Sequence, residues 1–174
     1  MRDRRNQLRE FQARLSDRLR QATTTDGSVR LGLMIGEERF LVDLSEAGEI
    51  VPLPPVITPV PLARDWFRGL VNLRGMLFAV SDLAGFGGDG STPLSKESRL
   101  LAVANRLNFN AAILVTRMLG LHNINTMRPD EQAPDRSGQQ PWRVRQLLDE
   151  QERSWTELSL LRLVADERFL MVNR

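Results

Sequence analysis

The chain of 174 residues offers few of the side chains that enzymes use for catalysis. It has no cysteine and a single histidine, His122, so a thiolate site or a histidine-based metal cluster cannot form, and a catalytic triad would depend on that one residue. Adjacent carboxylates occur at Glu37-Glu38, Asp130-Glu131 and Asp149-Glu150, and each pair lies in a turn or polar stretch where solvation explains it. We therefore expect no catalytic residue, no metal site, no cofactor and no enzymatic activity.

Three glycines have the spacing of a phosphate-binding loop. Gly85, Gly87 and Gly90 spell GxGxxG, but a dinucleotide site needs that run to open a helix directly after a strand. The residues that follow, Ser91–Ser98, show no helical pattern. We therefore predict a flexible glycine loop over Gly85–Ser91 and no phosphate site.

The apolar stretch that contains Arg74 carries one unexpected charge. Arg74 lies between Leu73 and Gly75, and a glycine lets the backbone turn or lets another molecule approach closely. Arginine stays charged at any working pH and is rarely buried without a partner. Arg74 is therefore either a contact for another protein or a structural residue paired inside the fold, and both alternatives stay open.

Strands are expected to position these residues. With 41% hydrophobic and 26% charged residues, the composition is that of an ordinary globular protein with one domain or two small lobes sharing a core. Trp66–Gly69 is predicted to be a turn. Alternating or continuous apolar runs predict strands and hairpins at Val29–Ile35, Arg39–Leu44, Met76–Leu83, Arg99–Ala104 and Ala111–Met118.

The first 28 residues are expected to lie outside this domain, which we place at residues 29–174. Residues 3–22 predict an amphipathic helix with an apolar stripe, which either docks on the domain or binds a partner. Residues 1–30 hold eight arginines and four acidic residues, with Phe11 as the only aromatic, which argues against nucleic-acid binding. No apolar run approaches the roughly 18 residues of a membrane helix, so no direct membrane insertion is expected.

Three consecutive motifs resemble the CheW family, the adaptor proteins of bacterial chemosensory arrays. They are Ile57-Thr58-Pro59-Val60-Pro61, the segment WFRGLVNLRG at Trp66–Gly75, and Val80-Ser81-Asp82-Leu83, and both their order and their spacing match the family pattern. The chain departs from that pattern at Thr116, where the family usually has aspartate, and at Ala79, where it has proline. The resemblance covers about residues 29–172.

The resemblance implies a mainly β fold of two small SH3-like β-barrel subdomains. The stretch Trp142–Asp149 fits strand and helix spacing equally well, and the resemblance favours a strand, followed by a turn at Glu150–Arg153 and a strand at Ser154–Glu157. A short C-terminal helix is expected at Leu158–Ala165, with Phe169–Val172 as a terminal apolar anchor.

The resemblance also implies a function. Proteins of this family are non-catalytic adaptors that couple the cytoplasmic tip of a methyl-accepting chemoreceptor to a CheA-type histidine kinase, in the cytoplasm at membrane-associated receptor arrays. The closing segment from Trp155 to Val172 resembles the PilI-type adaptors of the pathway that controls twitching by type IV pili. A CheW-type adaptor of flagellar chemotaxis, or of another chemosensory pathway, is the alternative.

Six residues are predicted to bind or position a partner. Arg74 and its neighbours in the NLRG motif are the first candidates, and Glu49 is the acidic residue whose place in the family pattern lies closest to the same surface. We hypothesise that Glu49 and Arg74 form a charge-assisted pair that holds this surface in shape. The full set is Glu49, Val51, Asn72, Leu73, Arg74 and Gly75.

Deletion of residues 1–22 is expected to leave the barrels folded, because the apolar stripe is narrow and the polar linker Thr23–Ser28 separates it from the first strand. Circular dichroism and thermal melting would test this, and a modest fall in melting temperature with retained kinase binding is expected. An insoluble truncated protein would show instead that the segment belongs to the core.

Overall fold

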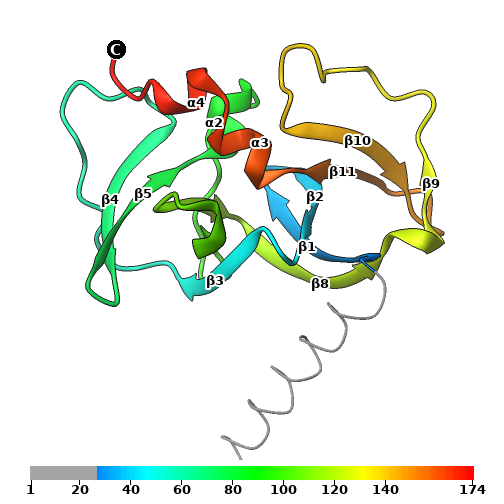
Figure 1. Ribbon diagram of the computed structural model, residues 1–174, viewed down its shortest axis with the longest axis horizontal. Helices are drawn as coiled ribbons and strands as arrows, with labels where there is room; N and C mark the ends of the chain where they lie inside the picture. Colours follow the sequence, from blue (N-terminus) through cyan, green and yellow to red (C-terminus); the bar gives the residue numbers. More distant parts are fainter. Residues whose placement is uncertain (1–26) are drawn as a thin grey trace, which may run out of the picture.

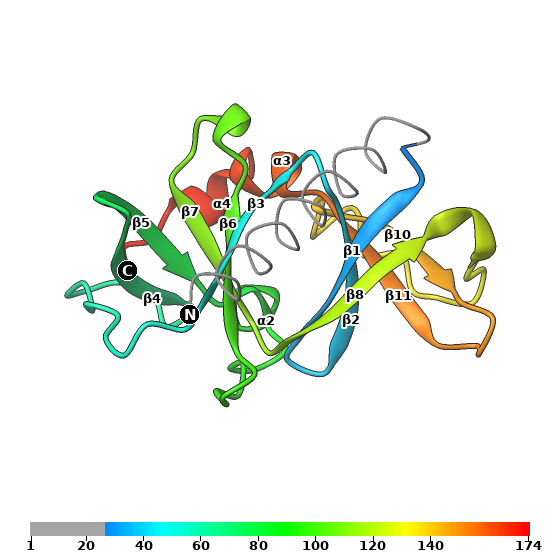
Figure 2. The same cartoon turned by 90° about the horizontal axis from the view of Figure 1, so that it is seen from below.

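The computed structural model describes residues 27–174. The helix predicted at residues 3–22 lies outside the described residues. Figures 1 and 2 show two curled β-sheets side by side, with short helices gathered over their junction in Figure 1. We call the six-stranded sheet lobe A and the five-stranded sheet lobe B. The mainly β architecture with two small barrels is confirmed.

Lobe A combines strands from both ends of the described chain. Its strand order is β8-β1-β2-β11-β10-β9, and β2 pairs with β11 in parallel while the other pairs are antiparallel. The strands are β1 (Val29–Ile35), β2 (Glu38–Asp43), β8 (Arg117–Asn123), β9 (Arg128–Pro129), β10 (Arg143–Leu148) and β11 (Ser154–Leu158).

Lobe B is formed by the middle of the chain. Its strand order is β3-β6-β7-β5-β4, with β5 and β7 parallel. The strands are β3 (Ala47–Pro52), β4 (Phe67–Leu73), β5 (Met76–Ser81), β6 (Arg99–Val103) and β7 (Ala111–Val115). The helices within residues 27–174 are α2 (Leu83–Gly87), α3 (Leu160–Val164) and α4 (Glu167–Leu170), and the 3-10 turns there are η1 (Asn105–Leu107) and η2 (Ile124–Thr126).

The largest core lies between the two lobes, where the outer faces of both sheets pack together. Each lobe also encloses a smaller core of its own, which includes Leu41 and Trp155 in lobe A and Phe78 and Leu114 in lobe B. The shared core takes side chains from both sheets and from α2, α3 and α4. Its members include Leu33, Ile35, Phe40, Leu83, Leu101, Ile113, Val115, Leu160, Leu163 and Phe169.

This arrangement explains why β6 and β7 are continuous apolar runs. Along β7, Ile113 faces the shared core, whereas Ala112 and Leu114 face the interior of lobe B. A strand buried on both faces has no solvent side that would favour polar residues. The predicted hairpins are present as β1–β2 and β6–β7.

The prediction of one strand over Ala111–Met118 is wrong, because the chain changes lobe at Thr116. The Thr116 N–H donates to the carbonyl of Met34 at 2.8 Å, and its hydroxyl donates to the carbonyl of Gly36 at 3.3 Å. These bonds fasten the crossing point to lobe A. The run therefore divides into β7 in lobe B and β8 in lobe A.

Three local predictions near the motifs are also wrong. The stretch predicted as a turn at Trp66–Gly69 is mostly strand, because β4 begins at Phe67 and absorbs Gly69 (φ 126°) in an irregularity of its register. The strand expected to reach Leu83 ends at Ser81, where Asp82 caps α2 by accepting a hydrogen bond from Gly85 N–H. The glycine loop predicted over Gly85–Ser91 is therefore wrong for Gly85–Gly87, which belong to α2, and the glycine run closes a helix instead of opening one.

The C-terminal predictions are mostly confirmed. The stretch Trp142–Asp149 contains the strand β10 (Arg143–Leu148), and a turn leads from it into β11. The predicted helix at Leu158–Ala165 is shorter, since α3 starts only after Ser159, whose hydroxyl accepts a hydrogen bond from Arg162 N–H. The expected apolar anchor includes α4, where Phe169 is buried in the shared core.

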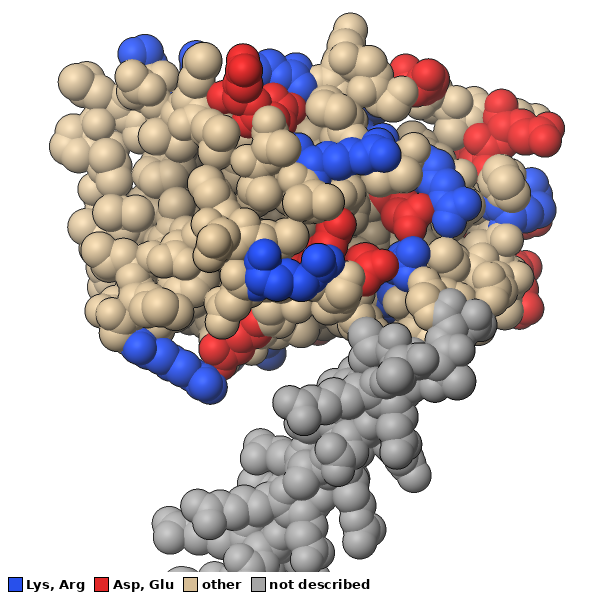
Figure 3. Space-filling view, in the orientation of Figure 1, with Lys and Arg blue, Asp and Glu red and all other residues tan. Residues whose placement is uncertain are grey.

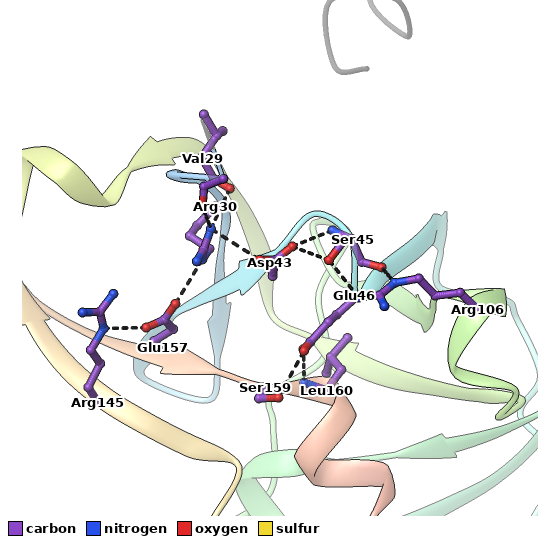
Figure 4. Close-up of polar contacts among 11 residues, drawn as sticks. Val29, Arg30, Asp43, Ser45, Glu46, Arg106, Arg145, Glu157, Ser159 and Leu160 are labelled. Atoms are coloured by element: carbon purple, nitrogen blue, oxygen red, sulfur yellow. Dashed lines mark hydrogen bonds and ion pairs between the residues drawn. The ribbon is translucent and has the colours of Figure 1, made fainter. Parts of the chain in front are cut away.

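Polar contacts join strands of lobe A and hold the start of α3 (Figure 4). Glu157 on β11 accepts from Arg30 on β1 at 3.1 Å and from Arg145 on β10 at 2.6 Å. Glu46, in the turn between the lobes, accepts from the N–H of Leu160 at 2.6 Å. Since the first N–H groups of a helix have no partner within it, this carboxylate stabilises the start of α3.

Asp149 anchors the turn between β10 and β11. Burial raises its pKa, but hydrogen bonds from Trp155 Nε1 at 2.8 Å and from Arg153 and Gln151 outweigh burial and lower the pKa to about 2. A carboxyl whose pKa is lower in the folded chain stabilises the fold above its unfolded pKa. That contribution is lost as the pH falls from about 4 towards 2.

Asp149→Asn should therefore lower the free energy of unfolding at pH 7 by roughly 1–2 kcal/mol. It should also flatten the dependence of stability on pH between about 4 and 2. Urea unfolding at several pH values would measure both effects, with Glu150→Gln as the control at the neighbouring exposed carboxylate. Parallel acid losses in the wild type and Asp149→Asn would contradict this role.

Candidate functional site

Glu49 and Arg74 form an ion pair across lobe B. Arg74 lies in the turn between β4 and β5, and its Nη2 is 2.6 Å from Oε1 of Glu49 on β3. Because β3 and β4 are the two edge strands of this sheet, the pair bridges opposite edges and helps to close the barrel. The hypothesised contact is present, but it lies on the surface, since the side chains of Arg74 and Glu49 are 81% and 40% exposed.

The turn that carries Arg74 is held by its neighbours. Arg74 and Gly75 both adopt left-handed conformations, with φ of 52° and 86°, as the two central residues of a type I′ hairpin turn do. The side-chain oxygen of Asn72 accepts a hydrogen bond from Gly75 N–H at 2.8 Å. Asn72 and Gly75 therefore shape the turn, and Arg74 projects from it into solvent.

The other two predicted residues support the site from inside. Val51 and Leu73 are half-buried and pack against the core of lobe B. Their side chains connect the surface bearing Glu49 and Arg74 to the barrel interior. The structure therefore brings all six predicted residues to one region, divided between an exposed rim and a packed base.

The sequence analysis did not predict the exposed apolar residues that lie beside the ion pair. Ile50 follows Glu49 on β3, and Met76 and Leu77 follow Gly75 on β5, with exposed fractions of 40%, 46% and 61%. In the sequence, Met76 and Leu77 merely begin an apolar run that reads as core. In Figure 3, charged side chains gather over lobe A and at the rims, while the middle of the lobe B half carries almost none.

His122 has a structural environment. Its Nε2 is 2.9 Å from the carbonyl of Leu119, and its ring lies 4.4 Å from that of Trp155. A side chain at Gly32 would collide with the imidazole.

No group of three or more histidine, cysteine or acidic residues within the described chain could hold a metal ion. Among residues 27–174, no helix is long and apolar enough to cross a membrane.

Comparison with known proteins identifies the family. The CheW-like domain matches residues 30–168. The chain belongs to the CheW-like family. It is 32% identical over 104 residues to Protein PilI of Pseudomonas aeruginosa, a match that covers 60% of this chain and 57% of PilI, so the chain spans little more than half of that relative.

A solved structure confirms the architecture. The scaffolding protein TtCheW from Thermoanaerobacter tengcongensis superposes with a TM-score of 0.63 at 22% identity, covering 78% of this chain and 90% of TtCheW. At this identity the match concerns the fold alone. The family match and the structural match therefore agree on a CheW-like domain with this two-lobed β fold.

The exposure of the ion pair predicts a small effect on stability. Exposed pairs contribute about 1 kcal/mol or less, and asparagine adopts the left-handed conformation more readily than arginine. Arg74→Asn should therefore change the free energy of unfolding by less than about 1 kcal/mol, as should Glu49→Gln. Urea denaturation would check both variants. A loss of about 3 kcal/mol would mean that the pair acts as a buried one.

Proposed function

We propose that this protein is a non-catalytic adaptor that couples a chemoreceptor tip to a CheA-type histidine kinase in the pathway controlling type IV pilus twitching. The observation that carries the proposal is the Glu49–Arg74 pair, exposed between two strand edges and next to exposed apolar side chains. Family membership supports the adaptor role, and the similarity to PilI supports the pathway. A flagellar or other chemosensory pathway is the alternative.

The composition of the surface suits a protein partner. Interfaces are enriched in arginine and methionine, and their binding energy concentrates in a few residues that the partner covers. Arg74, Met76 and Leu77 supply one charge and two apolar side chains within four residues of chain. A partner that covers them would exclude water and strengthen the attraction between Glu49 and Arg74.

This role places the protein in the cytoplasm at membrane-associated receptor arrays. An adaptor needs a rigid body so that partners on different surfaces keep a fixed geometry. The core shared by the two lobes provides that rigidity, because buried side chains of both sheets interdigitate there. In this proposal the protein acts by holding its partners in place and carries out no reaction itself.

Arg74→Asn should weaken binding of the kinase's regulatory domain about tenfold or more, since the turn is kept while the guanidinium is removed. Glu49→Gln should weaken it as well, and the double variant should lose less than the sum of the two. Titration calorimetry with the purified regulatory domain of the same bacterium would measure these affinities. Additive losses would mean that the two residues act separately.

The chain offers a matched control. Glu152 also has a left-handed backbone (φ 60°) and also makes an exposed ion pair, with Arg128 of lobe A. Glu152→Asn should therefore leave kinase binding unchanged. Equal losses in Glu152→Asn and Arg74→Asn would show a general effect of turn substitutions and would remove the support for this surface.

Pull-down of a pilus-pathway kinase or a flagellar one would decide between the two pathways.

A further inference from the structure

Two adjoining cavities form a groove around Trp66, at the end of β4 opposite to Arg74. The larger has a volume of about 540 Å³ and is lined by Arg64, Trp66 and Arg68 among others. The second, of about 440 Å³, shares Arg64 and Trp66 and adds Phe86 and Met171. We call the surface formed by Arg64, Trp66, Arg68, Phe86 and Met171 the Trp66 groove.

More arginines than acidic residues line the groove among residues 27–174. Of the acidic residues lining it, Asp65 is paired with Arg174, and Asp82 is buried and accepts hydrogen bonds from Thr92 N–H at 2.8 Å and its hydroxyl at 2.6 Å. Among residues 27–174, neither Arg64 nor Arg68 has a carboxylate within ion-pair distance.

The two free arginines are nevertheless held in place. Arg64 Nε donates to the carbonyl of Met171 at 3.1 Å, and Arg68 Nη1 donates to the hydroxyl of Ser91 at 3.2 Å. These are single bonds to neutral acceptors, so most of the five donors of each guanidinium stay available. Guanidinium donors at such positions suit carboxylates, which they bind bidentately.

The floor of the groove is aromatic and rigid. The ring of Trp66 stacks on that of Phe169, with centroids 5.6 Å apart and planes 14° apart, and Phe86 contacts Trp66 edge-on at 5.0 Å. Phe169 is buried in the shared core, so this floor is fixed to the body of the protein. An incoming side chain would therefore meet a preformed surface, which lowers the entropic cost of binding.

Exposed apolar residues lie in the groove and next to it, since Met171 lines the second cavity and Leu62 is bonded to Arg174, which lines the larger one. Leu62 is 83% exposed and Met171 is 56% exposed. Leu62 has a left-handed backbone (φ 59°), which is costly for leucine, and its carbonyl accepts a hydrogen bond from Arg174 N–H at 3.0 Å. The chain thus holds a large apolar side chain in solvent at a conformational cost, and such outliers cluster at binding sites.

We propose that the Trp66 groove is a second protein-interaction surface, which binds an acidic segment carrying an apolar side chain. Aspartate or glutamate of the partner pairs with Arg64 and Arg68, while its apolar side chain covers Leu62 and Met171. The proposal rests on the adaptor function, since an adaptor needs a surface for each partner. β4 separates the groove from Arg74 by roughly 20 Å, so both surfaces can be occupied at once.

The test uses the full chain and two probes, the receptor's cytoplasmic fragment and the kinase's regulatory domain from the same bacterium. The double variant Arg64→Glu/Arg68→Glu should weaken binding of the receptor fragment tenfold or more, because Arg74→Asn is expected to weaken binding of the kinase's regulatory domain instead. Raising the salt concentration should weaken the receptor fragment's binding to the wild type more steeply than its binding to the variant.

Two further variants guard against misfolding. Leu62→Asn removes the apolar side chain and suits the left-handed backbone, so it should keep the melting temperature and still weaken the same probe. Arg117→Glu reverses the charge of an exposed arginine on β8 and should leave that probe's affinity unchanged.

The outcomes separate the two proposals. Unchanged affinities of both probes for Leu62→Asn and the double arginine variant would overturn the groove as an interaction surface and leave the adaptor function intact. Losses confined to the probe that Arg74→Asn weakens would overturn the assignment to a second partner. A wild-type chain that binds neither probe would overturn the adaptor function and this inference with it.

Discussion

The packing of the two sheets against each other is the interaction on which the rest of the structure depends. Leu33 of lobe A and Leu101 and Ile113 of lobe B are completely buried in the core that the lobes share. Truncating a leucine at such a position typically costs about 2–5 kcal/mol, a large part of the stability of a small domain. Because this core belongs to both lobes, neither lobe can shift without breaking it, and surfaces at the two ends of lobe B keep a fixed relation to lobe A.

A buried arginine, Arg143, fixes the orientation of the two lobes at this apolar contact. Arg143 on β10 is 5% exposed, and its guanidinium pairs with Glu38 of β2 at 2.5 Å and with Asp89, after α2, at 3.0 Å. It also lies over the rings of Phe40 and Trp142. Apolar packing tolerates some sliding, whereas a buried charge is costly unless its partners stay in place. The contact with Asp89 therefore fixes how the segment after lobe B's β5 sits on lobe A.

Sequence patterns predicted those strands in which buried and exposed residues alternate along the chain. The alternation along Val29–Ile35 is visible because one face of β1 meets the shared core. The run Ala111–Met118 gives no sign that it divides into β7 and β8, because both halves are apolar. Only the hydrogen bonds of Thr116 to Met34 and Gly36 mark the point of division. The Glu49–Arg74 pair could be hypothesised because the family resemblance related two positions 25 residues apart. The Trp66 groove could not, because Arg64 meets Met171 across 107 positions of sequence and only the folded chain brings them together.

Two residues, at opposite ends of lobe B, adopt backbone conformations that their residue types disfavour. Arg74 and Leu62 both have positive φ, where glycine or asparagine would cost less, and both place long side chains in solvent. Either residue stabilises the free protein little, since an exposed ion pair contributes about 1 kcal/mol or less and an exposed leucine gains little from burial. Departures from local consistency are expected at functional sites. In the two proposed complexes a partner would cover both residues, and burial would then strengthen the charge pair and remove the apolar surface from water.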